Sequence, residues 1–533
     1  MSECYAVLLD TVSIQDYIFQ SNQLKENLGA SFLIEKRVYG KYLKDAAETV
    51  FGKKFDIKAW RSEPDAIRIR LHNDPFEVGY IGGGNALLLF QEKEKAEAFI
   101  REWTKSLLLH APGIITAVAS DEFDPDDFQK SKKRLFRILR ENKARYIPQT
   151  VVPAHGITSE CRHSSLSMET WNPSEGGEYV SAGTNARIEA SKAAKADINK
   201  KYQTELKGEF CFTNALEKLG QIGEEDSHIA IVHIDGNDMG TRFNDGSIDS
   251  LPKIRNLSIS VDEATQNAFV TLLNHIVENY DPVMEYLGFD NHLKDDRRWY
   301  PMDKEFERKI LPIRPIILGG DDITFVCDGK LGIYFSKLFI EAFEKQPVSF
   351  GGELTACAGV AMIKTKYPFY RGYKLAEDLC GNAKKVRRAK NDSCSYLDFH
   401  ISAGGISGTL EEIREKYFQT SSGKLLHRPY KLIPESSKDE KSFDQFVKNT
   451  RKFQKDFPNN KIHQLRQVLT LSEEVGRRFL QEMEYRGRKL PEIPGRSYSL
   501  FCCFEEEMKV TPYFDMIELG EYYPLKLNGD GDQ

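Results

Sequence analysis

The residues of this chain with the clearest chemical potential form the tetrapeptide Gly319-Gly320-Asp321-Asp322. It lies between two apolar runs, residues 315–318 and 323–327, which predict a β-hairpin with the tetrapeptide at its turn. Glycines allow the backbone angles of a tight turn and leave space for a phosphate group. Paired aspartates supply the oxygen ligands that Mg²⁺ and Mn²⁺ prefer. An ordinary hairpin turn could have the same sequence, so the tetrapeptide by itself leaves both interpretations open.

A further aspartate lies upstream, at the start of a glycine-containing loop. Residues 228–234 predict a buried strand that ends at Asp235. In a palm-type nucleotidyl transferase, an acid at the end of one strand and an acidic pair on the adjacent hairpin converge on two metal ions. We therefore predict that Asp235, Asp321 and Asp322 are the catalytic, metal-binding acids. The loop that follows would offer backbone N–H groups to a triphosphate, and it comprises Gly236, Asn237, Asp238, Met239 and Gly240.

A predicted helix beyond residue 373 brings a cation toward this site. Its apolar residues recur at helical spacing, so one face should pack on the sheet; they are Leu375, Leu379, Ala383 and Val386. Lys384 lies next to that face and could reach a phosphate as a point charge. It also belongs to a basic run that is typical of a solvated helix face, so both interpretations stay open.

The first half of the chain repeats the pattern of the second. Residues 80–90 place the glycine turn Gly82-Gly83-Gly84 between apolar strands, as residues 317–327 do. An upstream strand ends in an aspartate in each half, at Asp10 and Asp235, and another strand follows each hairpin. Two copies of one ferredoxin-like βαββαβ unit are therefore predicted.

The two copies differ at the turn, where Gly84 and Asn85 replace the acidic pair. We expect the first copy to bind nucleotide or shape the pocket through Gly82, Gly83 and Gly84, and the second copy to hold the metals. Asp10 is equally compatible with a turn or capping role.

These motifs resemble the large, polymerase/cyclase-like subunit of type III CRISPR effector complexes. The resemblance covers residues 235–240, 319–322, 356–369 and 375–384, and near the N-terminus residues 13–31 are similar to the family's first palm domain. It implies two facing palm domains with two ATP molecules between them, and a cyclic oligoadenylate product that activates defence effectors. By the resemblance, the acids at 235, 321 and 322 are metal ligands, Gly319 and Gly320 are turn residues, and the Asn237 loop and Lys384 contact phosphates.

The resemblance also implies cofactors and partners: two Mg²⁺ or Mn²⁺ ions, ATP as substrate, and the other subunits of such a complex, through which CRISPR RNA and target RNA would be bound. No His-Asp dipeptide occurs, so we expect a form that lacks the HD nuclease domain often found in the family. We expect no zinc either, because the two cysteines of residues 140–225, Cys161 and Cys211, together with His163 fall short of four ligands at convincing spacing. The adjacent Cys502 and Cys503 are interpreted as incidental.

Two other functions remain open. The chain could be a catalytically weak scaffold subunit of such a complex, although its intact acids speak against this. A palm enzyme that transfers AMP to another small molecule, or that uses GTP, would keep the same metal chemistry.

The composition of the 533 residues is typical of a cytoplasmic protein. Hydrophobic residues make up 40%, enough for several cores, and the nine cysteines are scattered, as in reducing compartments. No apolar run is long enough to cross a bilayer, so no membrane partner is expected. The net charge of -6 argues against a dedicated nucleic-acid wrapper, although the basic run at residues 130–145 could be a solvated helix face or the edge of an RNA groove.

We expect an α+β fold in four parts. Residues 1–150 should form the first palm domain, 151–222 a linker or small domain, 223–400 the second palm domain with a helical insert near 269–277, and 401–533 a C-terminal helical domain. In this last part, helices are predicted near 410–417, 443–457 and 462–485 from their apolar spacing.

Overall fold

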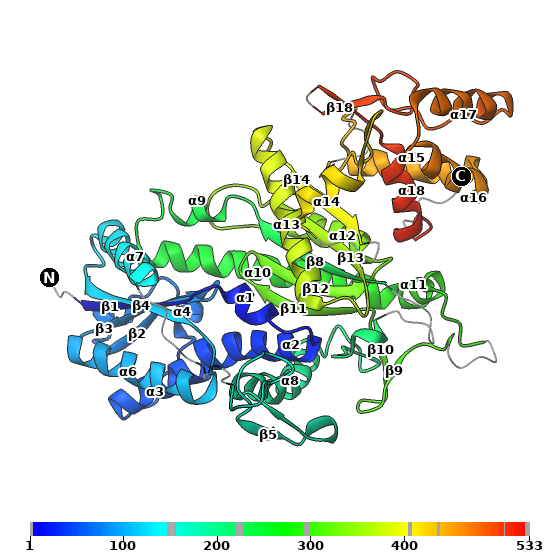
Figure 1. Ribbon diagram of the computed structural model, residues 1–533. Helices are drawn as coiled ribbons and strands as arrows, with labels where there is room; N and C mark the ends of the chain where they lie inside the picture. The colour runs from blue at the N-terminus through cyan, green and yellow to red at the C-terminus, as the bar shows by residue number, and fades with distance from the viewer. Residues whose placement is uncertain are drawn as a thin grey trace.

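The computed structural model describes residues 4–145, 151, 153, 156–219, 228–292, 298–402, 408–433, 438–505 and 507–527. The fold is α+β, as predicted, with two palm domains side by side and a C-terminal region at one end of the molecule (Figure 1). Within the described part of the chain, no helix is both long enough and apolar enough to cross a membrane.

The first palm domain is a four-stranded antiparallel sheet in the order β2-β3-β1-β4. This order and the helices between the strands define a ferredoxin-like unit. Its strands are β1 (Cys4–Thr11), β2 (Phe76–Gly82), β3 (Asn85–Phe90) and β4 (Thr116–Phe123). Helices α6 (Lys93–His110) and α7 (Phe128–Arg145) cover opposite faces of the sheet (Figure 1). Trp103 of α6 and Leu135 of α7 are buried, because each helix turns an apolar stripe toward the strands.

The chain between β1 and β2 is mostly helical. After α1 (Ile14–Phe19), helix α2 (Leu24–Phe32) continues into the π-helical segment η1 (Leu33–Tyr42) and then into α3 (Leu43–Phe51). Two short helices follow, α4 (Ala59–Ser62) and α5 (Arg68–Leu71). π-Helical geometry is rare and is found mostly at functional sites. The η1 segment also lines the large pocket of this molecule.

The second palm domain repeats the same sheet, in the order β11-β12-β8-β13, and extends it with β14 and β17. Its strands are β8 (His228–Gly236), β11 (Ile313–Gly319), β12 (Asp322–Asp328), β13 (Ala356–Lys364) and β14 (Ser395–Ile401). Its helices are α9 (Met239–Phe243), α10 (Leu251–Glu278), α11 (Tyr280–Leu287), α12 (Gly332–Glu344) and α13 (Phe369–Ala389). The predicted helical insert is α10 and α11, and α10 extends to the first palm domain, where Arg255 donates to Gly79 O at 2.7 Å (Figure 1).

The two sheets agree in register as well as in order. Asp10 lies opposite Asn85 in the first sheet, and Asp235 lies opposite Asp322 in the second. Each hairpin carries a bulge at the same place, since the register shifts between Val78 and Tyr80 in β2 and between residues 315 and 317 in β11. Bulges are conserved features rather than defects. The shared bulge therefore supports the predicted duplication independently of the sequence motifs.

The region between the palm domains packs on both of them. It comprises β5 (Thr170–Asn172), β6 (Glu178–Val180), α8 (Ala182–Lys201) and β7 (Phe210–Cys211). Helix α8 crosses α2 very closely, because a Cβ on Gly29 would lie only 1.9 Å from Arg187 O. Strand β7 pairs with β10 (Arg308–Ile310), which pairs with β9 (Met302–Asp303), both within the second palm segment.

The C-terminal region is helical, as predicted, but it also contains strands. The helices are α14 (Leu410–Tyr417), α15 (Phe443–Asp456), α16 (Asn459–Val468), α17 (Glu473–Tyr485) and α18 (Tyr513–Tyr522). A small sheet has the order β15-β16-β19-β18, formed by Gln419–Thr420, Gly423–Lys424, Met508–Val510 and Cys503–Glu505. Strand β17 (Tyr430–Leu432) leaves this region and pairs with β14, so the sheet of the second palm domain extends beyond residue 400.

Candidate active site between the two palm domains

The β11–β12 turn brings the three predicted acids together. Gly320 and Asp321 are the two loop residues, and only Gly320 has a positive φ, of +59°, as a type II′ turn requires. The Gly236 N–H donates to Asp321 O at 3.0 Å, which holds the turn against the end of β8. Asp322 then lies opposite Asp235 in the ladder. Asp321 thus occupies the turn and Asp322 the strand, and this offset lets neighbouring residues serve one site.

The carboxylates at this place repel one another. Burial and, to a smaller extent, the charge of Asp235 together raise the pKa of Asp321 to about 7. Burial also raises the pKa of Asp322, against the lowering effects of His233 and Gln15. Oδ1 of Asp322 has no hydrogen-bond partner. One cation offsets this charge, since Lys384 Nζ lies 2.5 Å from Asp235 Oδ2.

These observations fit a divalent cation. Three carboxylates, two of them with raised pKa values, an oxygen without a partner and a single nearby lysine form an oxygen-rich site with excess negative charge. Mg²⁺ and Mn²⁺ bind such carboxylates together with substrate phosphates. Asp235, Asp321 and Asp322 are the residues that would hold them.

The loop after β8 is engaged within the protein at several points. The Asn237 N–H donates to Thr355 O at 2.8 Å, and the Asn237 side chain donates to the Thr355 hydroxyl. Asp238 forms an ion pair with Arg387. Because the N–H groups of Gly236 and Asn237 are already bonded, any phosphate contact in this conformation would come from amides further along the loop.

A large pocket opens between the palm domains, with a volume of about 1950 Å³. The second palm domain lines it with residues 317–322, which include Gly319, Gly320, Asp321 and Asp322. The first palm domain lines it with residues 80–85, which include Gly82, Gly83 and Gly84. Both glycine turns therefore face one shared space, which is larger than the usual single-ligand site of about 300–1,000 Å³.

Basic side chains dominate the charged lining of this pocket. Six acids line it, namely Glu35, Asp45, Asp56, Asp262, Asp321 and Asp322. Ten cations do so, namely Lys36, Lys41, Lys44, Lys54, Lys58, Arg61, Lys132, Lys133, Arg140 and Lys201. A cleft lined by an excess of one charge focuses the field and attracts ligands of the opposite charge. The lining thus suits a polyphosphate or an oligonucleotide.

The first palm domain keeps one acid and one lysine of the site. Asp10 pairs with Lys143 of α7, as Asp235 pairs with Lys384 of α13. Burial raises the pKa of Asp10, against the effect of Lys143. The turn differs, since Gly83 and Gly84 both have positive φ, of +56° and +75°, as in a type I′ turn. A Cβ on Gly84 would lie 2.6 Å from Ile14 Cδ1, so α1 covers the place where an acid stands in the other copy.

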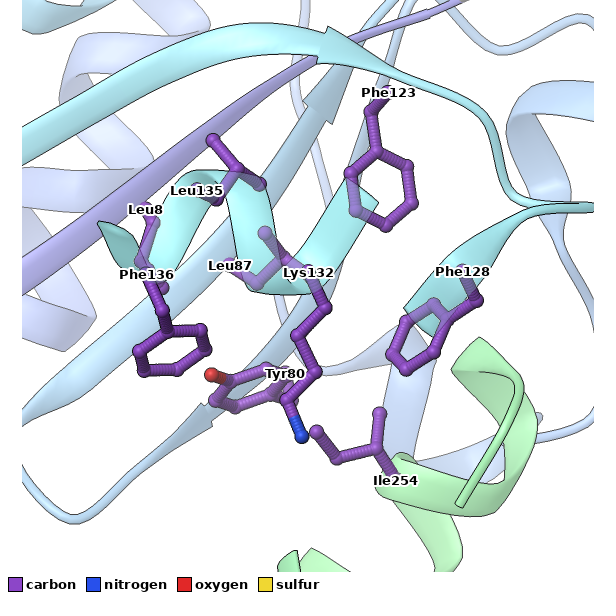
Figure 2. Close-up of a pocket in the computed structure, with 9 residues that line it drawn as sticks. All are labelled: Leu8, Tyr80, Leu87, Phe123, Phe128, Lys132, Leu135, Phe136 and Ile254. Atoms are coloured by element: carbon purple, nitrogen blue, oxygen red, sulfur yellow. The ribbon is translucent and has the colours of Figure 1, made fainter. Parts of the chain in front are cut away.

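Several cations of the basic run on α7 make contacts within the protein, among them Lys132, Arg134 and Lys143. Lys132 is buried, donates to Phe243 O of the second palm domain at 2.5 Å, and has its pKa lowered to about 8 by burial. Figure 2 shows its stem crossing a small apolar pocket, with the amine directed past Tyr80 toward Ile254. That pocket has a volume of only about 10 Å³. It is therefore part of the packing between α7, the sheet and α10, and cannot hold a nucleotide.

Residues before α2 join the two palm domains at the acids, and the sequence analysis assigned them no role. Gln15 Nε2 donates to Asp322 Oδ2 at 2.9 Å. Asp16 pairs with Lys374 at 3.2 Å, and Phe19 stacks on Tyr373 with ring centroids 3.6 Å apart. The segment did carry a signal, because residues 13–19 belong to the motif that resembles the family's first palm domain.

The three residues considered for zinc between the palm domains lie in separate contacts. His163 is held between Glu26 and Glu178, at 2.6 and 3.0 Å. Cys161 Sγ lies near the Thr184 hydroxyl and Cys211 Sγ near Arg308 O. They do not form a metal-ligand cluster in the described residues.

The fold and the site together define a palm protein of the nucleotidyl cyclase-like class, with two palm copies and acids on the second. Residues 228–394, from the start of β8 to the residue before β14, match the family model of the Cas10/Cmr2 second palm domain. This segment is therefore similar to a Cas10/Cmr2 second palm domain, and the predicted resemblance is confirmed for it.

Solved structures show similarity over more of the chain. A Csm1–Csm4 cassette in complex with cA4 is 14% identical, with a TM-score of 0.40 over 75% of this chain and 55% of that chain. A cassette in complex with pppApA is 13% identical, with a TM-score of 0.48 over 97% and 69%. A Csm1–Csm4 subcomplex of the type III-A CRISPR-Csm interference complex is 14% identical, with a TM-score of 0.41 over 92% and 68%. The chain spans about half the length of the first of these chains. No curated protein matches the chain.

Proposed function

We propose that this chain is a metal-dependent nucleotidyltransferase that makes cyclic oligoadenylate from ATP. The observation that carries the proposal is that Asp321 and Asp322 line the pocket that both glycine turns line, with Asp235 opposite Asp322 in the neighbouring strand. The volume of that pocket, about 1950 Å³, suits more than one nucleotide.

In this proposal each palm domain has a different task. The second presents its three acids to the reacting α-phosphate, and Lys384, beside Asp235, would steady the phosphates as a point charge. The first would hold a nucleotide beside Gly82, Gly83 and Gly84, with its ribose hydroxyl toward the acids. Holding both reactants in one pocket supplies the orientation that phosphoryl-group chemistry requires.

Two Mg²⁺ or Mn²⁺ ions bound by Asp235, Asp321 and Asp322 would supply charge neutralisation at the phosphates and a lower pKa of the attacking hydroxyl. The protein's own part is to hold the carboxylates close together before substrate arrives. Gln15 contributes by donating to Asp322 Oδ2, which fixes the orientation of this carboxylate.

We further propose that the chain works as the large subunit of a type III CRISPR effector complex, where other subunits bind CRISPR RNA and target RNA. The Cas10/Cmr2 palm match supports this assignment.

A second candidate is a catalytically weak scaffold subunit. The backbone N–H groups of Gly236 and Asn237 are already bonded within the protein, which favours the scaffold because fewer amides of this loop remain to bind phosphates. AMP transfer to another small molecule, or use of GTP, would involve the same acids.

The test is mass spectrometry of products from ATP with Mg²⁺ or Mn²⁺, using the protein alone and with its assembled RNA complex plus target. Asp321→Asn with Asp322→Asn is run beside it. The matched control is Asp249→Asn with Asp281→Asn, which changes two exposed aspartates of the same palm domain. Cyclic oligoadenylate that is lost only in the first variant supports the proposal. Product from GTP alone supports the other transferase, and no nucleotide product under any condition supports the scaffold.

A further inference from the structure

A cluster of metal-binding side chains lies far from the palm acids, in the C-terminal region. His427, Glu440 and Cys503 each place one ligand atom within 4.8 Å of the others. It is the one such group of three or more ligand residues found in the described part of the chain. The residues come from three separate segments: the chain before β17, the turn before α15, and the first residue of β18.

His427 has no other evident structural role for its ring nitrogens. The residue is only 1% exposed, and both Nδ1 and Nε2 are buried without a hydrogen-bond partner. A buried polar group without a partner costs about 1–3 kcal/mol, so such groups are rare unless they bind a ligand, an ion or water. A metal ion beside one of these nitrogens would satisfy it.

Cys502, next to Cys503 in the chain, is a candidate for the fourth ligand, although its sulfur lies outside the group of three and would have to turn toward the ion. Its sulfur lies 3.9 Å from that of Cys503, and both side chains are buried. Two thiolates on one zinc ion, each with a bond of about 2.3 Å, would be about 3.8 Å apart in tetrahedral geometry. A disulfide would need about 2.05 Å. The observed separation therefore excludes a disulfide and is compatible with two ligands of one ion.

The surroundings suit an anionic metal complex. The charges of Lys441, Lys390 and Arg496 act at the His427 side chain. Zn²⁺ with two thiolates, one carboxylate and a neutral imidazole carries a charge of about -1. The three neighbouring cations would neutralise it.

The carboxylate already has the support expected around a metal ligand. Arg496 donates to Glu440 Oε2 at 2.6 Å and to Oε1 at 2.9 Å. A carboxylate has about four acceptor positions, so these bonds leave room for an ion and fix the orientation of the group.

We propose that His427, Glu440, Cys502 and Cys503 bind one structural Zn²⁺ ion. Zinc binding deprotonates the two thiols, and both protons pass to solvent. The ion joins the chain that leads into β17, at the edge of the palm sheet, to β18 of the small C-terminal sheet. It thereby fastens the C-terminal region to the second palm domain. This site is separate from the segment at residues 140–225, where zinc was considered from the sequence. It assigns metal binding to Cys502 and Cys503, which were interpreted as incidental.

The test measures zinc by inductively coupled plasma mass spectrometry in the full chain, purified without chelators and passed through a desalting column. We expect one zinc per chain in the unchanged protein and a loss of about tenfold or more in Cys503→Ser and in His427→Asn. Cys394→Ser is the matched control, because this partly exposed cysteine lies outside the cluster. Asp321→Asn with Asp322→Asn should also keep the zinc, which separates this site from the palm metals.

Two results overturn the proposal: absence of zinc from the unchanged protein after incubation with equimolar Zn²⁺, or full zinc content in both ligand variants. Circular dichroism and gel filtration show whether a variant has unfolded. If one has, the unchanged protein is loaded with Co²⁺ instead. Strong thiolate-to-cobalt absorption that disappears after thiol blocking supports the cysteine ligands, and its absence contradicts them.

Discussion

The two palm domains are built on one sheet but differ at the turn that faces the pocket. Both have a strand that ends in an acid paired with a lysine, Asp10 with Lys143 and Asp235 with Lys384. Both have a bulge at the same place in the hairpin. Only the second has the acidic pair, and only the first has two left-handed residues in its turn. The difference teaches that a palm sheet can have the same charge pair and hairpin geometry whether or not its turn carries an acidic pair.

The largest difference should appear when the acids of the second palm domain are removed. Asp321→Asn with Asp322→Asn should lower product formation by about a hundredfold or more, because bound metals contribute several kcal/mol to such reactions. Asp10→Asn in the first palm domain should lower it much less. Product measurements on both variants, with thermal unfolding to verify the fold, check this asymmetry. Equal losses in the two would contradict the separate roles.

The affinity for Mg²⁺ should depend on pH through Asp321 of the second palm domain. The pKa of Asp321 is raised to about 7, so protons compete with metal below that pH. We expect Mg²⁺ affinity to rise by up to about tenfold per pH unit between pH 5 and 7 and then to level off. Titrations of activity against Mg²⁺ at several pH values measure this. An affinity that does not change over this range would count against Asp321 as a ligand.

The same raised pKa has a consequence for stability without metal. An acid whose folded-state pKa exceeds its unfolded value of 3.8 binds a proton more tightly when folded, so the metal-free protein should lose stability as pH rises from about 4 to about 7. Asp328, whose pKa burial also raises to about 7, contributes in the same window. The readout is therefore the difference between the unchanged protein and Asp321→Asn in urea unfolding with EDTA. The variant should show the shallower pH dependence.

Substitution of the lysines paired with Asp235 and Asp10 should have smaller effects on the kinetics, which differ between the two palm domains. Lys384→Met should lower turnover by about tenfold, while Mg²⁺ affinity stays the same or rises, because a cation beside Asp235 is gone. Lys143→Met should raise the KM for ATP by a few-fold and leave turnover nearly unchanged. Steady-state kinetics of both variants separate the two parameters. Reversed behaviour would mean that the first palm domain, not the second, holds the reacting phosphate.

The smallest effect should come from the bridge between the palm domains. Gln15→Leu removes the hydrogen bond to Asp322 and should lower activity about threefold to tenfold, the range for one ordinary protein hydrogen bond of about 0.5–1.5 kcal/mol. Gln15→Glu should be worse, because it places a second negative charge against the carboxylate. Metal titrations compare the two variants. If Gln15→Glu is the milder change, the bridge does not act through charge.

Much of this arrangement could be predicted from local sequence. An apolar strand that ends at Asp235 and a hairpin that turns before Asp322 place the two acids opposite each other in a sheet. Helical spacing located Lys384 beside the packed face of α13. The C-terminal helices at 410–417 and 443–456 followed from their apolar stripes. In each case the residues adjacent in sequence indicate the type and the ends of the helix or strand.

The features that were missed depend on contacts between distant segments. Gln15 reaches Asp322 only after the palm domains have docked, and β17 joins the palm sheet from beyond residue 400. The helix predicted for 462–485 is two helices, and Ser472 at an N-cap position followed by Glu473 was a signal for the second start. The pairing of His427 with Cys503 has no local signal, because their segments are adjacent only in the folded chain.

The contact between Gly84 and Ile14 bears on which residue the turn of the first palm domain can hold. An aspartate at position 84 would collide with the Ile14 side chain and would have to adopt a left-handed backbone at φ +75°. An aspartate there would therefore have a strained backbone and would displace the Ile14 side chain from its place beside the turn. The turn of the first palm domain thus limits which residue can stand at position 84, independently of any metal.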